Sequence, residues 1–328
     1  MNANTDATNS ASNDDNTEGT PLLGMSRRSL IGGSSLGAAG LAAASVLGTP
    51  TAAAARDGQG GRGGRRFEDR AVLITGGTSG IGRATALAFA AEGARVGFCG
   101  RREELGRRVE REIRDAGGEA TYIRADVRDP RQVQRFVDRV AAAYGGVDIA
   151  FNNAGIGGGK LPHEMTVEEW DDIQLTNARG VFLAIKYEVP YMLKAKGGVI
   201  ICTSSSAAEQ ARPNGAAYTA SKRAVQGIVK AAALAYGTQG IRINAILPGT
   251  TDTPFIRPAG LSDAAWEQFK KAFGPLNIDG LERVAEPQEI ARAVLALASG
   301  DFPYMTGASV AVDGGATAGR KMVQPPKK

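Results

Sequence analysis

A glycine-rich turn between two regular segments constrains the fold of this chain more than any other feature. Residues 71–75 form a short apolar run suited to a buried parallel strand, and residues 84–91 begin a helical pattern. Between them lies the stretch Thr75-Gly76-Gly77-Thr78-Ser79-Gly80-Ile81-Gly82. Glycine lets the backbone turn sharply and lets a diphosphate approach the helix N-terminus, where unpaired N–H groups and the helix dipole favour an anion. This unit predicts a dinucleotide-binding fold.

Strand-like and helical patterns continue to alternate after the turn. Four further apolar runs predict strands at residues 95–99, 121–125, 147–151 and 199–203. Helical patterns separate these runs at residues 103–116, 130–144 and 167–193. Alternation of this kind predicts an α/β domain in which helices cover a parallel sheet.

The end of the second expected strand bears on the choice of cofactor. In a dinucleotide fold an acidic residue at this position holds the ribose hydroxyls of NAD, whereas an arginine accepts the 2′-phosphate of NADP. Gly100 occupies the position and Arg101 follows it. We therefore expect NADP(H) to be favoured over NAD(H). The alternative is that Arg101 only caps a solvated loop.

Polar residues follow three other strands, at the edge where open α/β sheets bind ligands. Asp126 follows the third strand, in position to accept from an adenine amino group. The amides Asn152 and Asn153 follow the fourth, where they either satisfy loop backbone groups or line the crevice, and three serines at 204–206 follow the fifth. A further amide, Asn177, falls inside an apolar helical pattern, so it either stabilises a helix distortion or serves the site.

Tyr218 and Lys222 stand four residues apart at the start of another helical pattern, and therefore on one helix face. A neighbouring cation favours the phenolate and brings the tyrosine pKa down from about 10, which suits acid–base catalysis. The same spacing also occurs by accident on solvated helix faces. The pair alone does not establish a site.

The first 55 residues differ from the rest. Residues 1–24 are polar and predict disorder, Arg27 and Arg28 precede an apolar run at 30–47, and small residues follow at 49–55. This order is typical of an export signal, and the paired arginines resemble a twin-arginine signal. We expect cytoplasmic folding, export to the periplasm or exterior, cleavage near Ala55, a flexible linker at 56–66 and no membrane span after cleavage. An uncleaved anchor is the alternative, although glycines and serines dilute the run.

Composition argues against several other functions. The net charge of +5 is spread along the chain without interleaved aromatic residues, so we expect no nucleic-acid partner. Cys99 and Cys202 lie in strand-like runs and predict buried thiols rather than a disulfide. The lone His163 has no clustered cysteines or carboxylates, so no metal site is predicted.

Taken together, the motifs resemble those of the short-chain dehydrogenase/reductase family. They are the glycine turn, Asn152-Asn153-Ala154-Gly155, Asn177, Ser205, Tyr218-x3-Lys222, Pro248-Gly249 and Asp313-Gly314-Gly315. The resemblance covers residues 67–315 in family order and implies one Rossmann-like, doubly wound domain at 67–316. Its seven-stranded parallel sheet would end with strands at 242–247 and 309–312. The sequence departs from the family at Ser79, where NADP-preferring members often carry a basic residue, so the cofactor preference rests on Arg101.

The resemblance also implies roles for the site residues. Tyr218 would exchange the hydroxyl proton, and Lys222 would lower the tyrosine pKa and bind the nicotinamide ribose. Ser205, preferred among the three serines because it lies thirteen residues before Tyr218, would hydrogen-bond the carbonyl oxygen. Asn177 would hold a water linked to Lys222. The expected cofactor-binding residues are Gly76, Ser79, Gly80, Ile81, Gly82, Arg101, Asp126, Val127, Asn153, Ala154, Gly155, Tyr218, Lys222, Pro248, Gly249, Thr251 and Thr253.

The C-terminal third is expected to contain a mobile lid at about 250–285. Phe255 and Trp266 would cover a small or medium-sized organic substrate there, unless they only pack against helices. A basic tail at 317–328 is predicted to be disordered from residue 320 onward. Because family members commonly form tetramers through long helices, we expect a homotetramer or a homodimer.

The sequence thus predicts an oxidoreductase that prefers NADP and interconverts a secondary alcohol and a ketone or aldehyde. Tyr218 would be its general acid and base. A 3-oxoacyl-thioester reductase or a sugar dehydrogenase is the alternative among enzymes. A non-catalytic dinucleotide-binding sensor or scaffold is the alternative of another class, but a binding module has no need of the Tyr218–Lys222 pair.

Overall fold

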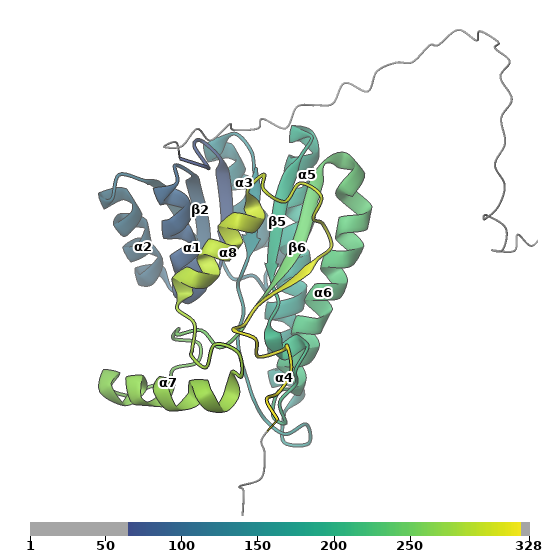
Figure 1. Cartoon of the computed structure of the whole chain (residues 1–328). Helices are drawn as coiled ribbons and strands as arrows, with labels where there is room; N and C mark the ends of the chain where they lie inside the picture. Colours follow the sequence, from purple (N-terminus) through teal and green to yellow (C-terminus); the bar gives the residue numbers. More distant parts are fainter. Residues whose placement is uncertain (1–64, 323–328) are drawn as a thin grey trace, which may run out of the picture. The chain divides into compact units, whose positions relative to one another are not determined.

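The computed structural model describes residues 65–322, and a parallel sheet runs through them (Figure 1). Its seven strands follow the order β3-β2-β1-β4-β5-β6-β7, so the order reverses between β1 and β4 and opens a crevice at their carboxyl ends. The strands are β1 (Ala71–Thr75), β2 (Arg95–Gly100), β3 (Glu119–Arg124), β4 (Ile149–Asn152), β5 (Gly198–Thr203), β6 (Ile241–Pro248) and β7 (Ser309–Val312).

Helices cover both faces of the sheet (Figure 1). On one face α1 (Gly80–Ala91), α2 (Glu103–Asp115) and α8 (Pro287–Ala298) share an apolar core that includes Phe89, Ile113 and Val294. On the other face α3 (Pro130–Tyr144), α5 (Gly180–Ala195) and α6 (Ala216–Tyr236) bury Phe136 and Val229. All five residues of β1 are buried, as expected for a central strand with both faces covered. The predicted Rossmann-like sheet is confirmed.

The helical region expected at 167–193 is present and continuous, and it contains α4 (Val167–Gln174), a π-helical segment (Leu175–Arg179) and α5. One helical feature differs from the sequence prediction. The prediction omitted α8, although Pro287 at its first position and the Glu286–Glu289 capping box are helix-start signals. The lid contains α7 (Asp263–Asn277), which Figure 1 shows below the sheet and apart from both helical layers.

The lid is joined to the start of the basic tail. Arg320 Nε lies 3.1 Å from Asp279 Oδ2, and Lys321 forms an ion pair with Glu282. Lid carboxylates thus neutralise both cations, and the disorder predicted for the tail from residue 320 stays a prediction. Residues 1–64, which include the expected export signal and most of the linker, and residues 323–328 lie outside the described part of the chain. Between residues 65 and 322, no helix has the length and apolar character needed to cross a membrane.

A buried carboxyl group links α5 to the end of β4. Glu188 has 0% exposure, and its Oε2 accepts a hydrogen bond of 2.9 Å from Asn152 Nδ2. Burial raises the pKa of Glu188 to about 8. Glu188 Oε1 and Asn152 Oδ1 have no hydrogen-bond partner among the described residues. A proton on Glu188 that is directed at the Asn152 oxygen satisfies both atoms, so we expect a neutral acid–amide pair.

We predict that Glu188→Gln flattens the dependence of stability on pH. The folded protein keeps the Glu188 proton up to about pH 8, whereas the unfolded chain releases it near a pKa of about 4.3. Since the folded state binds more protons across this window, its free energy of unfolding falls as the pH rises, by at most about 1.4 kcal/mol per pH unit. Denaturant titrations at a series of pH values measure the slope.

Two variants make the experiment specific to the acid–amide pair. The side-chain amide introduced by Glu188→Gln can form both hydrogen bonds with Asn152 and does not titrate, so the stability of this variant should lose the wild-type slope. Glu188→Leu leaves the buried Asn152 amide unpaired, and it should be less stable than Glu188→Gln. The same slope in the wild type and in Glu188→Gln would contradict a neutral Glu188.

Candidate active site

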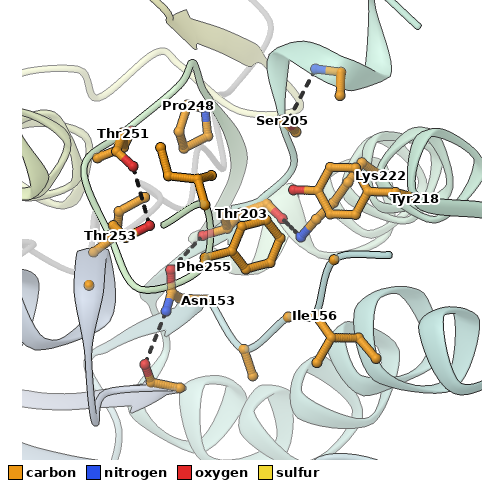
Figure 2. A pocket seen from close by; sticks show the side chains of 18 of the residues that line it. Asn153, Ile156, Thr203, Ser205, Tyr218, Lys222, Pro248, Thr251, Thr253 and Phe255 are labelled. Atoms are coloured by element: carbon orange, nitrogen blue, oxygen red, sulfur yellow. Dashed lines mark hydrogen bonds between the residues drawn. The ribbon is translucent and has the colours of Figure 1, made fainter. Parts of the chain in front are cut away.

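A cavity of about 660 Å³ lies at the carboxyl ends of the strands. The glycine turn, the segments that follow β2 to β6 and the start of α6 line it. Its size is typical of a site for a cofactor or a small organic molecule. Figure 2 shows Tyr218 and Lys222 entering it from α6, with Phe255, Thr251 and Thr253 on the segment that follows Pro248.

The glycine turn follows a path that requires glycine. Gly76 has φ +71° and Gly80 has φ +53°, both in the left-handed region that side chains disfavour. Both residues line the cavity together with Ser79 and Ile81, as predicted. Gly82 is not among the residues that line it, so its expected contact with the cofactor stays a prediction. A Cβ at Gly82 would overlap the Gly76 carbonyl oxygen, so this glycine lets α1 pack closely under the turn.

The segment after β4 holds the glycine turn in place. Asn153 Nδ2 donates to Gly76 O at 3.2 Å, and the Asn153 backbone N–H donates to Thr75 Oγ1 at 3.0 Å. Asn153, Ala154 and Gly155 line the cavity. Asn152 and Asn153, whose roles the sequence did not decide, therefore differ. The Asn152 side chain donates a hydrogen bond to Glu188, whereas Asn153 lines the cavity and forms a hydrogen bond with the glycine turn.

The end of β2 excludes a carboxylate and supplies positive charge. A Cβ at Gly100 would lie 2.6 Å from Thr78 Cγ2, so a larger residue does not fit there without movement of Thr78. Arg101 and Arg102 both line the cavity, and Arg102 Nη2 donates to Ser79 Oγ at 2.7 Å. The sequence analysis considered only Arg101. The presence of two adjacent arginines in the sequence was the signal that could have identified Arg102 as a second cavity residue.

Asp126 and Val127 line the same end of the cavity. The Arg128 guanidinium forms hydrogen bonds with Asp126 Oδ2 and pairs with Asp172 of α4. These hydrogen bonds lower the pKa of Asp126, so its carboxylate stays charged. Asp126 thus offers an acceptor where an adenine amino group was expected.

Tyr218, Lys222 and Ser205 meet at the centre of the cavity. Lys222 Nζ donates to Thr203 O at 2.8 Å and lies 5.7 Å from the centroid of the Tyr218 ring. Ser204 Oγ donates instead to the backbone oxygen of Lys222, at 2.8 Å. This contact turns Ser204 towards α6 and leaves Ser205 as the hydroxyl beside Tyr218, in agreement with the choice of serine.

The pKa of Tyr218 moves in the direction opposite to the expected one. Burial raises it, and a hydrogen bond with Ser205 offsets only part of the increase. Burial also lowers the pKa of Lys222 to about 8, so the ammonium is itself destabilised. The expectation that Lys222 lowers the pKa of Tyr218 is therefore not met, because the ammonium is directed at Thr203 O.

Asn177 lies at a helix distortion, as one of the two alternatives expected, and it is not itself among the residues that line the cavity. It lies in the π-helical segment, and its side chain has 0% exposure. A π-helical segment is a distortion often found at functional sites. Asn177 Oδ1 accepts from Ile156 N at 2.8 Å, and its Nδ2 donates to Ile156 O at 2.9 Å and to Ser221 Oγ at 3.0 Å. Asn177 thereby shapes the cavity wall at Gly155, where a Cβ would lie 3.3 Å from Lys222 Nζ. The water link to Lys222 stays a prediction.

The lid places its two predicted substrate residues differently. Phe255 lines the cavity, with its ring centroid 5.9 Å from that of Tyr218. Trp266 does not line it. Its side chain is buried, and its Nε1 donates to Asp252 Oδ1 at 2.7 Å, while Lys270 pairs with the other carboxylate oxygen. This arrangement agrees with the alternative in which Trp266 only packs, because its indole N–H anchors α7 to the loop after β6.

The loop after β6 forms a wall of the cavity and approaches the glycine turn, since a Cβ at Gly80 would lie 3.0 Å from Thr253 Cγ2. Pro248, Gly249, Thr251 and Thr253 all line the cavity. A Cβ at Gly249 would lie 2.6 Å from Asp313 Cα, so the Pro-Gly and Asp-Gly-Gly motifs meet in space. Together with the glycine cradle, this wall fits a nicotinamide dinucleotide. Residues 65–322 hold no cluster of three or more His, Cys, Asp or Glu side chains suited to a metal ion.

Comparison with known proteins decides the family. Residues 76–317 match the family model described as Enoyl-(Acyl carrier protein) reductase. This chain belongs to the short-chain dehydrogenase/reductase family. It is 37% identical over 268 residues to the 3beta-hydroxysteroid dehydrogenase of Mediterraneibacter gnavus, covering 77% of this chain and 96% of that protein.

Other relatives agree with this assignment. The chain is 36% identical over 253 residues to the cyclohexanol dehydrogenase of an Acinetobacter species, covering 77% of this chain and 96% of that protein. Its structure is similar to the crystal structure of levodione reductase, with a TM-score of 0.72 and 35% identity over 78% of this chain and 100% of the other. The protein is thus an NAD(P)-dependent oxidoreductase that interconverts alcohols and ketones.

The arrangement assigns chemistry to the chain's own residues. A bound nicotinamide supplies or accepts the hydride. Tyr218 would donate a proton to the substrate oxygen in reduction and take it back in oxidation. Ser205 would donate a hydrogen bond to the same oxygen as negative charge develops. Lys222, fixed by Thr203 O, lies beside both the phenol and the cavity.

We predict that Tyr218→Phe abolishes turnover and preserves cofactor binding. The variant keeps the ring that contacts Phe255 but loses the acidic proton, so kcat should fall at least about 100-fold. Fluorescence titration with the reduced cofactor and steady-state kinetics measure the two properties separately. Tyr236→Phe makes the same substitution at the far end of α6, outside the cavity, and should leave both unchanged. Near-normal turnover by Tyr218→Phe would contradict the assignment.

Proposed function

We propose that this protein is an NADPH-preferring reductase of a cyclic ketone and that it catalyses the reverse oxidation when NADP⁺ is supplied. The observation that carries the cofactor preference is the arginine pair at the end of β2. Gly100 carries no carboxylate of the kind that NAD-binding proteins use, a larger residue there would require Thr78 to move, and Arg101 and Arg102 line the cavity beside it. Guanidinium groups bind a ribose 2′-phosphate through charge-assisted hydrogen bonds.

The proposed direction follows from the state of Tyr218. Burial keeps the phenol protonated, so the resting site holds the proton that carbonyl reduction consumes. Support for a ring substrate comes from the relatives, which include a 3beta-hydroxysteroid dehydrogenase and a cyclohexanol dehydrogenase. Phe255 adds a flat apolar surface beside Tyr218, on which a saturated ring can pack.

Export and assembly are further parts of the proposal. The sequence around Arg27 and Arg28 supports twin-arginine export of the folded protein to the periplasm or exterior, with cofactor already bound. A homotetramer or homodimer is supported by exposed apolar side chains on long helices, Phe182 of α5 and Leu234 of α6 among them. Fractionation of cells and light scattering of the purified protein test these two points.

We predict that Arg101→Gln and Arg102→Gln each reduce the preference for NADPH. Loss of one charge-assisted contact with the 2′-phosphate should lower kcat/KM for NADPH about 10-fold or more and leave kcat/KM for NADH nearly unchanged. Arg111→Gln removes the same charge from an exposed position on α2 that does not line the cavity, and it should have no effect on either cofactor. A wild-type enzyme that binds NADH more tightly than NADPH would refute the proposed preference.

A further inference from the structure

We propose that Arg212 forms a binding subsite for a carboxylate group of the substrate at the mouth of the cavity. The proposal deepens the function given above and rests on it for the position of the reacting ketone at Tyr218. It narrows the substrate to a cyclic oxo-acid and its hydroxy-acid product. Nothing in the sequence motifs assigns a role to Arg212, which lies between the catalytic Ser205 and Tyr218.

The loop between β5 and α6 places Arg212 at the mouth. The loop begins at Ser205 and returns to the cavity at Tyr218, and Arg212 lines the cavity from an exposed position. The opposite side of the mouth is the glycine run that follows β4. There a Cβ at Gly159 would lie 3.3 Å from Asn214 O, so the two loops are in contact beside Arg212. Arg212 and Tyr218 thus line the same cavity.

The Arg212 side chain is held in a way that leaves its hydrogen-bond donors available. Its Cζ lies 5.8 Å from the centroid of the Phe273 ring of α7, a cation–π contact that covers one face of the guanidinium. The N–H donors of a guanidinium point outward in its plane, so stacking does not consume them. Within residues 65–322 this guanidinium has no carboxylate partner and donates no hydrogen bond.

Neighbouring arginines show the contrast. Arg223 on α6 pairs with Glu209, and Arg257 in the lid pairs with Asp263. These pairs neutralise their charges on the surface, outside the residues that line the cavity. Arg212 also lies at the substrate end, but no carboxylate among the described residues pairs with its guanidinium.

The charges along the cavity favour an anion at this end. The acidic residue that lines the cavity is Asp126, which lies at the adenine end and is bound by Arg128. At the substrate end Lys222 is directed at Thr203 O, so Arg212 is the cation that a substrate group can engage. One guanidinium with no second cation beside it matches the single charge of a carboxylate, which it binds through two parallel hydrogen bonds.

The subsite should act on substrate binding more than on the chemical step. Arg212 is remote from the reacting carbon, so its contact is equally strong in the ground state and the transition state. Such uniform binding lowers KM and leaves kcat unchanged. Because the guanidinium is exposed, the effect should be moderate, about 10-fold, and should weaken as salt is added.

Two isosteric ketones test the subsite with the NADPH-bound enzyme. These are 4-oxocyclohexanecarboxylate and its neutral primary amide, which share ring, size and reacting carbonyl. We expect the wild type to show a KM about 10-fold lower for the acid than for the amide. Arg212→Gln should raise the KM for the acid to that of the amide and leave the amide unchanged. Arg135→Gln, which removes an exposed charge on α3 away from the cavity, should retain the preference.

A binding measurement separates failure of the subsite from failure of the proposed reaction. Calorimetric titration with cyclohexanecarboxylate and cyclohexanecarboxamide, which cannot be reduced, reports affinity without turnover. If the wild type binds the acid more tightly than the amide and Arg212→Gln does not, the subsite is supported, whether or not either ketone is reduced. If neither ketone is reduced in that case, only the proposed reduction of a ring ketone is wrong. If the acid binds no more tightly than the amide, with or without turnover, the subsite is overturned.

Discussion

The close approach of two backbone segments is the constraint on which the rest of the site depends. A Cβ at Gly76 would lie 2.8 Å from Ala154 Cα, so the glycine turn and the segment after β4 touch at the point where the strand order reverses. Asn153 joins them with hydrogen bonds to Thr75 and Gly76. The contact sets the floor of the cavity, and the catalytic side chains of α6 and β5 are arranged around that floor. A side chain at Gly76 would therefore disturb the whole cavity rather than one contact.

Burial, more than charge pairing, sets the protonation states around this floor. It raises the pKa of Tyr218 and of Glu188 and lowers that of Lys222, in each case because the charged form is the one that loses solvation. The lysine is oriented by a neutral acceptor, Thr203 O, and not by a carboxylate. Its role in this arrangement is to present hydrogen-bond donors at a fixed place, whereas Ser205 is the group that favours the phenolate. The site is thus poised to donate a proton.

The sequence predicted what depends on local pattern. Strand β1, the glycine turn and the spacing of Tyr218 and Lys222 follow from periodicity and from the conformations that glycine alone adopts readily, and the structure brings these elements together. The role of Trp266 was left open because its hydrogen bond to Asp252 joins residues fourteen apart through a loop whose path the sequence does not specify. The direction of the Tyr218 pKa depends on how much solvent the surrounding packing removes from the phenol, and residue spacing does not report this.

Helix α7 contacts both the loop after β6 and the loop between β5 and α6, and these contacts join residues that are distant in sequence. Trp266 and Lys270 bind Asp252 in the loop that lines the cofactor wall, and Phe273 on the same helix stacks on Arg212 at the mouth. The Asp252 contacts involve a buried indole and a mostly buried ammonium, whereas the Arg212 contact is at an exposed side chain. Contacts that exclude water are the stronger of the two, so the helix is fixed at the cofactor side and freer at the substrate side.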